Sequence, residues 1–299
     1  MGSPLHPPSR PRAEPRLAEP APDRRLPDDR GWWLVEEGFD LAREHEVESL
    51  LAISNGYLGT RASLAEGSEF SAPATFVSGV YGQRSEPQAV PELVTAPDAL
   101  RLRIVVEGEA LTLGDGDALE HRRALDMRRA ILWRMWRHRT PAGRITKIRE
   151  RRLASLADRH VLLQVVELTP ENYGGRVELE SRIDAEVPVQ PLTVPPPALT
   201  PVPRASGASA PARLALRAEG TGAVVALAVE SALHAAGKSL APRVEASGSR
   251  IVERWTLTAE IGKPYRLTRV VAVHSSRDAK SPARAAAAHV DRLGPEAAD

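Results

Sequence analysis

The 299-residue sequence contains no cysteine. This absence excludes disulfide bonds, thiolate nucleophiles, cysteine-ligated zinc and iron–sulfur clusters. It also excludes a secreted scaffold held together by disulfides, and it is compatible with the reducing cytoplasm, where we predict that the protein resides. Aromatic residues make up only 4% of the chain, so few large rings are available for a core or for stacking on sugars.

The chain also lacks a surplus of charge and a long apolar run. Forty Lys and Arg residues stand against 39 Asp and Glu residues, a formal net charge of +1. Nucleic acids and anionic membranes select proteins with a basic surplus, so we expect neither as a partner. No apolar stretch approaches the roughly 20 residues that a membrane-spanning helix needs. The N-terminal residues contain no apolar segment of a signal peptide.

The motifs of common active sites are absent as well. The sequence has no G-x-S-x-G nucleophile elbow, no H-E-x-x-H zinc motif, no P-loop and no dinucleotide-binding fingerprint. The eight histidines show no metal-ligand spacing, so we predict isolated structural histidines and no metal site. His121 and His138 have arginine neighbours, which disfavour a protonated ring and are typical of solvated strand faces.

The 26 prolines are concentrated in two segments. Residues 1–30 hold eight of them among Arg, Asp and Ala, with too little apolar surface to offset the entropy of ordering the backbone. We therefore predict a disordered Pro/Arg-rich tail over residues 1–30. Residues 188–211 hold eight more, and consecutive prolines donate no hydrogen bonds to a sheet. We predict a Pro-rich surface loop between two strands over residues 188–211.

Elsewhere, apolar and polar residues alternate with the period of two that is typical of half-buried strands. Ile131, Trp133 and Met135 are predicted to face a core, opposite Arg134 and His138. Further strands with intervening turns are predicted at residues 101–106, 162–166, 177–183, 212–218, 224–229, 251–258 and 267–273.

Two shorter patterns complete the secondary structure. Glu44, Glu46 and Glu48 alternate with other residues and predict the solvated face of a strand. Near the C-terminus, Ser281 is a suitable N-cap and Pro282 a suitable first residue for a short helix. Many short strands with one terminal helix predict a mainly β fold, a large antiparallel β-sandwich.

A set of short motifs resembles one enzyme family. The run from Glu48 to Arg61, Glu-Ser-Leu-Leu-Ala-Ile-Ser-Asn-Gly-Tyr-Leu-Gly-Thr-Arg, resembles the opening motif of glycoside hydrolase family 65, the family of the maltose, trehalose and kojibiose phosphorylases. Further stretches that match in the same order are Gly79–Gly82, Pro91–Val94, Ala96–Asp98, Leu125–Arg128, Leu153–His160, Thr169–Tyr173 and Ser275–Asp278. The resemblance covers about residues 32–293.

The resemblance implies a division of the chain and a role for it. Residues 31–278 would be the family's N-terminal β-sandwich, a supersandwich of the galactose mutarotase-like type, and residues 279–299 the start of a helical linker. In this family the general acid, a Glu in a Gly-Pro-Asp-Glu-Tyr-like motif, and the phosphate site lie on an (α/α) barrel. The chain has no such motif, so we expect no catalytic residue in it. No cofactor is expected, with inorganic phosphate as co-substrate if the full-length protein is a phosphorylase.

The resemblance also names partners and candidate site residues. The expected partners are the catalytic barrel, in cis or in trans, a carbohydrate substrate and a second copy of the full-length enzyme. Asn55, Tyr57, Arg61 and Glu92 are candidates for the edge of the substrate site. The alternative is that Asn55 and Gly56 only form a turn and that Arg61 makes an internal salt bridge.

A second hypothesis belongs to another functional class. The chain would be a stand-alone carbohydrate-binding module, with Trp32-Trp33 and the pair Trp133 and Trp136 as surfaces that stack on sugar rings. The motifs distinguish neither trehalose from maltose or kojibiose, nor phosphorolysis from hydrolysis.

Overall fold

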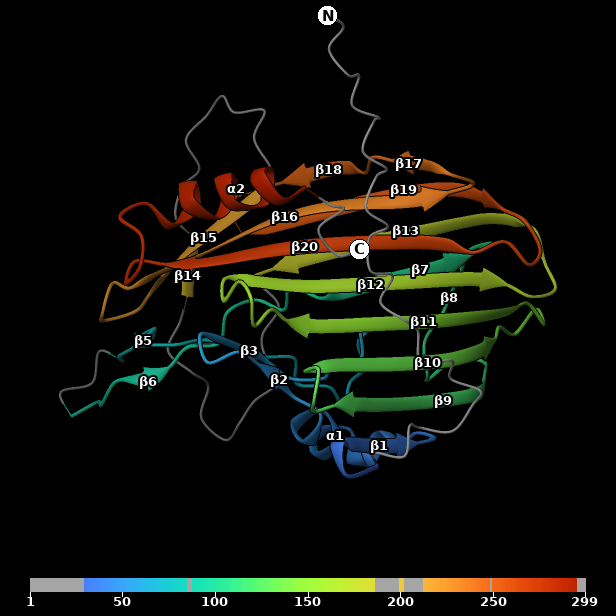
Figure 1. The fold of residues 1–299 in the computed structure, drawn as a ribbon, viewed down its shortest axis with the longest axis horizontal. Coiled ribbons are helices and arrows are strands. Elements are labelled where there is room, and N and C mark those ends of the chain that lie inside the picture. Colours follow the sequence, from blue (N-terminus) through green and yellow to red (C-terminus); the bar gives the residue numbers. More distant parts are fainter. Residues whose placement is uncertain (1–29, 85–87, 186–198, 202–211, 248, 295–299) are drawn as a thin grey trace, which may run out of the picture.

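The computed structural model describes residues 30–84, 88–185, 199–201, 212–247 and 249–294. Within these residues, two antiparallel sheets face each other and form the large sandwich that the alternating pattern predicts (Figure 1). The predicted tail and most of the predicted Pro-rich loop lie outside the described residues. Part of that loop was predicted wrongly, because Leu199–Pro201 form a short strand, β14, that pairs with the strand Ala212–Ala218.

The larger sheet is built mostly from neighbouring strands joined by tight turns. Its order is β1 (Trp33–Glu37), β9 (Asp117–Asp126), β10 (Ile131–Arg139), β11 (Ile145–Ala154), β12 (Val161–Pro170), β20 (Tyr265–Ser275), β16 (Val224–Ala235), β15 (Ala212–Ala218) and β14, with β17 (Lys238–Leu240) also paired to β16. The facing sheet has the order β18 (Arg243–Ala246), β19 (Arg250–Ala259), β13 (Gly175–Asp184), β7 (Arg101–Val106) and β8 (Glu109–Ala110).

Smaller elements lie beside the sandwich. One short sheet contains β2 (Ile53–Ser54), β3 (Leu58–Thr60) and β4 (Thr75–Val77), and another contains β5 (Tyr81–Gly82) and β6 (Glu92–Leu93). The helical segments are η1 (Arg30–Trp32), η2 (Leu41–Arg43), α1 (Glu44–Leu50) and α2 (Pro282–Leu293). No helix in the described part of the chain is long and apolar enough to span a bilayer.

Two apolar clusters fill the space between the two sheets. One is built around Leu162, Ile183 and Leu227, and the other around Leu168 and Trp255. Because β12, β13 and β19 each contribute residues to both clusters, the two clusters follow one another along the length of the strands.

A layer of buried polar side chains occupies positions between these clusters. The register places Arg134 opposite Glu150, Arg152 opposite Gln164, and Gln164 opposite Arg269, which forms a row across β10, β11, β12 and β20. Gln164 accepts a hydrogen bond of 2.5 Å from Nη1 of Arg269 and donates one of 2.6 Å to Glu150. Such a layer is tolerated in a core only when its charges are paired.

The predicted orientation of β10 was wrong. Arg134, Trp136 and His138 point inward and are buried, whereas Trp133 and Met135 are only half-buried. The period of two was correct, but it does not identify the inward face when that face carries paired charges. His138 was therefore wrongly predicted as solvated, and His121 is buried as well.

Residues 44–50 form a helix, so the predicted solvated strand face was wrong. Glu44 and Glu48 lie one helical turn apart on the buried side of α1, next to Val47 and Leu51. Each carboxylate has a cationic partner, Arg123 at 2.7 Å for Glu44 and Arg61 at 2.9 Å for Glu48. A spacing of four residues places two side chains on one helix face, and this period determines the structure here.

The terminal helix α2 begins at Pro282 as predicted, although the Ser281 side chain makes no capping hydrogen bond. It covers the outer face of the larger sheet over β16 and β20 (Figure 1). The contact consists of small side chains that allow close approach: Ala286, Ala287 and Val290 on the helix, and Ala226, Ala228, Val270 and Ala272 on the sheet.

Candidate functional site

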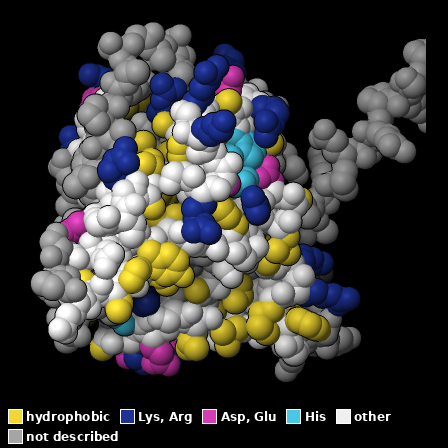
Figure 2. All heavy atoms as spheres, turned by 90° about the vertical axis from the view of Figure 1, so that its left-hand side faces the viewer, with side chains coloured by type: hydrophobic (Ala, Val, Ile, Leu, Met, Phe, Trp, Pro, Cys, Tyr) yellow, Lys and Arg dark blue, Asp and Glu magenta, His cyan; other side chains and the backbone are white. Residues whose placement is uncertain are grey.

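Three of the motifs that carry the family resemblance meet at one end of the sandwich, which Figure 2 views face on. They are the turn between β2 and β3, the turn between β11 and β12, and the loop between β20 and α2. Asn55 joins the first two turns, since its Nδ2 donates to the carbonyl oxygens of Ser155, at 2.7 Å, and Arg159, at 3.0 Å. Its Oδ1 accepts from the backbone N–H groups of Tyr57 and Leu58.

Tyr57 lies between all three segments. Its ring is buried and meets the His160 ring edge-on at 4.5 Å between centroids, while the Arg159 guanidinium lies 5.2 Å from the centre of the Tyr57 ring. Its hydroxyl is 3.5 Å from Oγ of Ser275, in the loop motif. Burial raises the pKa of Tyr57, so the phenol stays protonated. Tyr57 therefore holds the turns together at this end.

Three histidines that are far apart in sequence come together beside Tyr57. The rings of His160 and His274 stack with their centroids 4.0 Å apart, and Nε2 of His274 lies 3.0 Å from Nδ1 of His289. His289 belongs to α2, and His274 to β20. The prediction of isolated histidines was wrong for these three. Figure 2 shows histidine side chains reaching the surface beside an acidic side chain, with Lys and Arg side chains around them.

Two carboxylates complete this group, which we call the histidine cluster (His160, His274, His289, Asp158 and Asp278). Oδ2 of Asp158 lies 2.7 Å from Nε2 of His289. Oδ2 of Asp278 lies 3.4 Å from Nδ1 of His160 and 3.9 Å from Nδ1 of His274. Burial alone would raise the pKa of Asp158, but hydrogen bonds from the His160 backbone and from His289 lower it overall. Asp158 therefore serves as an acceptor within the cluster, and Asp278 accepts from the backbone N–H and the hydroxyl of Ser275 beside it.

The donor set of the cluster, two imidazoles and a carboxylate, is one that binds zinc, but its geometry does not fit an ion. The ligand atoms of His160, His274 and Asp278 lie within 4.8 Å of one another. However, the two imidazole planes are nearly parallel, 9° apart, and stacked. A metal bound in the plane of one ring would lie out of the plane of the other, whereas zinc binds imidazole nitrogen in the ring plane at about 2.0–2.1 Å.

The other two predicted site residues, Arg61 and Glu92, lie away from Asn55, Tyr57 and the histidine cluster. Arg61 pairs with the buried carboxylate of Glu48 and donates to the carbonyl oxygen of His45 at 2.8 Å, which is the predicted internal salt bridge. Glu92 lies on β6, where Arg84 approaches it at 3.3 Å. The structure thus brings Asn55 and Tyr57 together and places Arg61 and Glu92 elsewhere.

An open groove of about 540 Å³ runs beside β9, but its ionisable groups are already engaged. Glu37 pairs with Arg122, and Glu120 pairs with Arg137. His121 at its base is held on both sides, by the Gly38 carbonyl oxygen and by Nε of Arg134. Burial, reinforced by Arg134, lowers the pKa of His121 to about 3. The groove therefore offers no poised acid–base pair.

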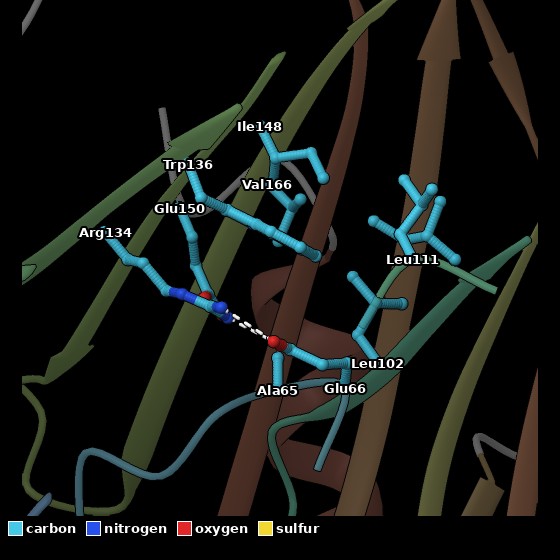
Figure 3. Close-up of a pocket in the computed structure, with 10 residues that line it drawn as sticks. Ala65, Glu66, Leu102, Leu111, Arg134, Trp136, Ile148, Glu150 and Val166 are labelled. Atoms are coloured by element: carbon cyan, nitrogen blue, oxygen red, sulfur yellow. Dashed lines mark hydrogen bonds and ion pairs between the residues drawn. The ribbon is translucent and has the colours of Figure 1, made fainter. Parts of the chain in front are cut away.

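A small void of about 10 Å³ lies beside the polar layer (Figure 3). Arg134 and Glu66 meet there through two hydrogen bonds of 2.6 and 2.7 Å, with Glu150 beside them. Trp136, Ile148 and other apolar side chains form the remaining walls. The void has room for about one water molecule, so it is too small for a sugar.

Most of the tryptophans proposed for sugar stacking are buried or half-buried in the sandwich. Trp136 is buried in an apolar cluster, and the Arg151 guanidinium lies 5.6 Å from the centre of the Trp133 ring. Trp33 is half-buried in β1, whereas Trp32 is exposed. Trp136 is therefore unavailable to a ligand, and Trp32 is the most exposed ring of the four.

Sequence reasoning missed the three histidines as a group. Their separation in the chain gives no local spacing signal. His160 and Asp278 do end two of the family-like motifs, so the motifs themselves were the available clue. His289 lies on a helix outside the quoted motifs and carried no signal of its own.

Comparisons with known proteins extend these observations. The family model described as "Glycosyl hydrolase family 65, N-terminal domain" matches residues 34–297. A kojibiose phosphorylase of Caldanaerobacter subterraneus is 35% identical over 162 residues, which are 54% of this chain and 21% of that protein. An uncharacterized glycosyl hydrolase of Mycobacterium tuberculosis is 34% identical over 164 residues, 52% of this chain and 12% of that protein.

One solved structure shares the fold. It is a human-microbiome protein assigned as a kojibiose phosphorylase, with a TM-score of 0.74 and 18% identity, and the match covers 86% of this chain and 34% of that chain. The chain therefore spans only part of its relatives: its matches cover 20–21% of the length of two kojibiose phosphorylases, those of Caldanaerobacter subterraneus and Thermoanaerobacter brockii.

Proposed function

The chain belongs to glycosyl hydrolase family 65 as its N-terminal domain, and we propose that it is the non-catalytic sandwich of a disaccharide phosphorylase that splits an α-linked glucose disaccharide with phosphate. The observation that carries the proposal is the match over residues 34–297 to a domain that forms only part of its relatives. Kojibiose is the first substrate to test, because the named relatives include kojibiose phosphorylases.

The state of the acidic groups supports a non-catalytic role. Cleavage of a glycosidic bond needs a proton donor for the leaving oxygen, and phosphate or activated water on the other face. At the motif end, Asp158 accepts a hydrogen bond from His289, Asp278 accepts one from Ser275, and Glu92 has an arginine partner. We therefore assign general-acid catalysis and phosphate binding to the catalytic barrel.

The exposed apolar side chains at the same end supply a docking surface for that barrel. Tyr81 and Leu93 are cross-strand partners in the β5–β6 hairpin and are 42% and 47% exposed. Val90, before β6, is 69% exposed, and Leu156, in the β11–β12 turn, is 71% exposed. We call these four residues the arm surface. Contiguous apolar surface marks a contact site, whereas single exposed side chains are ordinary, and the paired Tyr81 and Leu93 supply the contiguous part here.

Three further elements belong to the same proposal. The full-length enzyme would act on the carbohydrate through its barrel, with Asn55 and Tyr57 holding the turns behind the contact. It would form a homodimer, and it would reside in the cytoplasm, as the cysteine-free composition allows. No metal or organic cofactor takes part.

A domain exchange tests this function. The N-terminal domain of the Thermoanaerobacter brockii kojibiose phosphorylase would be replaced by residues 30–294 of this chain, and release of glucose 1-phosphate from kojibiose and phosphate would be measured. The chimera is expected to retain phosphorolysis, whereas the same enzyme without any N-terminal domain loses it.

Two variants of the chimera make the test specific. Replacing Tyr81 and Leu93 by serine is expected to lower activity at least tenfold, because the barrel loses its apolar contact. Replacing Ile261, which is also exposed but lies in the β19–β20 turn, should leave activity unchanged. A folded chimera without activity, or an undiminished enzyme without the domain, would contradict the proposal.

A further inference from the structure

The histidine cluster connects helix α2 to the sandwich through a chain of shared hydrogens. The Asp158 carboxylate can only accept, so Nε2 of His289 donates to it across 2.7 Å. A neutral His289 then has its lone pair on Nδ1, which accepts from Nε2 of His274 across 3.0 Å. His160 donates from Nδ1 to the Val273 carbonyl oxygen at 2.9 Å. Three neutral imidazoles satisfy this arrangement.

The same arrangement has no room for full protonation. If both His274 and His289 carried two ring hydrogens, two of those hydrogens would lie between nitrogens only 3.0 Å apart. A second hydrogen on His160 would occupy Nε2, which faces the Arg159 guanidinium at 3.4 Å. The stacked rings would also place two cations about 4.0 Å apart. With α2 docked, His274 and His289 therefore cannot both take up the second hydrogen that each would accept as a free side chain.

We propose that the histidine cluster is a proton-sensitive latch, which holds α2 on the sheet while its rings are neutral and releases the helix when they become protonated. The helix lends itself to release, because its contact with the sheet consists mostly of alanine and valine side chains. His289 is the latch residue on α2, and Asp158 is its acceptor on the sandwich. This inference does not depend on the proposed function.

The groups around the cluster act in both directions: burial and the neighbouring rings disfavour a protonated His274, whereas the carboxylates of Asp158 and Asp278 favour it. The β11–β12 turn contributes Asp158, Arg159 and His160, the β2–β3 turn contributes the Tyr57 hydroxyl, and the loop before α2 contributes Asp278. Burial, together with His160, lowers the pKa of His274 to about 4, and Asp278 offsets this only in part.

A second titrating group under α2 acts in the opposite sense. Burial, and then the helix residue Asp291, raise the pKa of Glu230 on β16. Repulsion between these two acids weakens helix docking at neutral pH and is relieved when Glu230 is protonated. Because the pKa of Glu230 is raised above the usual glutamate value, this relief falls within the pH range in which the latch is lost and reduces the net release of α2.

The pKa of His274 fixes the pH range of the effect. Above a pH of about 6.5, the pKa of a free histidine, His274 is neutral whether α2 is docked or released, and docking has its full stability. Below that pH the released state gains a proton that the docked state resists, so docking weakens until the pH reaches about 4, where the docked ring is protonated as well. We expect the opening equilibrium of α2 to rise roughly tenfold between pH 7 and pH 5.

Hydrogen exchange measured by mass spectrometry on the 299-residue chain tests the latch. Exchange of α2 amides would be compared at pH 7 and pH 5 after correction for the intrinsic rate, with β19 amides as an internal reference. The expected result is a roughly tenfold loss of protection in α2 with β19 unchanged. Equal protection of α2 at both pH values, or parallel loosening of β19, would overturn the proposal.

Two variants assign the effect to the cluster. His274→Gln keeps an N–H donor toward His289 but cannot gain a proton, so the pH response of α2 should flatten. His45→Gln changes an exposed histidine on α1 and should leave the response intact. A His274→Gln variant with the full wild-type pH response, or a His45→Gln variant without one, would overturn the assignment.

Discussion

Replacing Glu48 by alanine is expected to destabilise the domain severely, because its carboxylate is fully buried and has three donors. Nη2 of Arg61 lies at 2.9 Å, the backbone N–H of Ala72 at 2.8 Å, and the Ser63 hydroxyl makes a third hydrogen bond. These contacts fasten α1 to the segment that follows β3.

The magnitude follows from what the substitution leaves behind. Arg61 is a quarter exposed and can regain water, whereas the Ala72 amide and the Ser63 hydroxyl are buried. A buried donor left without an acceptor costs about 1–3 kcal/mol. Two such donors are left, so together they cost about 2–6 kcal/mol. We therefore expect Glu48→Ala to lower the free energy of unfolding by about 3–5 kcal/mol, the middle of that range.

Urea unfolding followed by tryptophan fluorescence measures this change. Glu46→Ala is the matched control, because Glu46 lies on the same helix with an exposed partner, Arg43, at 3.1 Å. An exposed pair of this kind contributes little to stability, because water and salt screen it. If Glu48→Ala costs no more than Glu46→Ala, the buried network does not hold α1, and the structural role of Arg61 is wrong.

Three further predictions concern other parts of the molecule. Glu230→Gln should raise the free energy of unfolding by about 0.5 kcal/mol at pH 7 and by less at pH 4, because the raised pKa makes only the ionised form unfavourable; urea midpoints at both pH values check this. Gly116→Ala should cost at least about 1 kcal/mol more than Gly143→Ala, because forcing an extra group into a packed site costs about 1–3 kcal/mol. Both glycines have positive φ, but only at Gly116 would a Cβ clash with a backbone atom, the carbonyl oxygen of Arg139; urea midpoints would be compared, and equal costs would contradict the packing. The isolated chain should bind a hydrophobic dye or self-associate through the arm surface, and serine variants of that surface should reduce both; a monomer that binds no dye would contradict an uncovered docking face.

The sandwich could be predicted from the sequence because most of its strands bury only one face. Residues 101–106 coincide with β7, and the predicted strand at 177–183 lies within β13; buried and more exposed positions alternate in both. The face of β10 that points into the core could not be predicted, because Arg134 faces inward toward Glu66, a partner far away in the chain. Local periodicity contains no information about such partners.

The candidate site was predictable only in part, and for a related reason. The family-like motifs identified Asn55 and Tyr57, and both do join the segments that meet at the motif end. The same motifs gave no indication that Arg61 lies under α1 rather than beside Tyr57. The histidine cluster depends on the packing of α2 against β20, and that contact follows from the tertiary fold.

The central claim is that this family 65 domain carries no catalytic machinery of its own. The most direct test is to incubate the purified 299-residue chain with kojibiose and phosphate, and in parallel with maltose and trehalose, and to measure glucose and glucose 1-phosphate. The account predicts no release above the protein-free control. Turnover by the isolated chain that disappears when one of its own carboxylates is replaced would contradict the account, because it would show that the sandwich contains an active site.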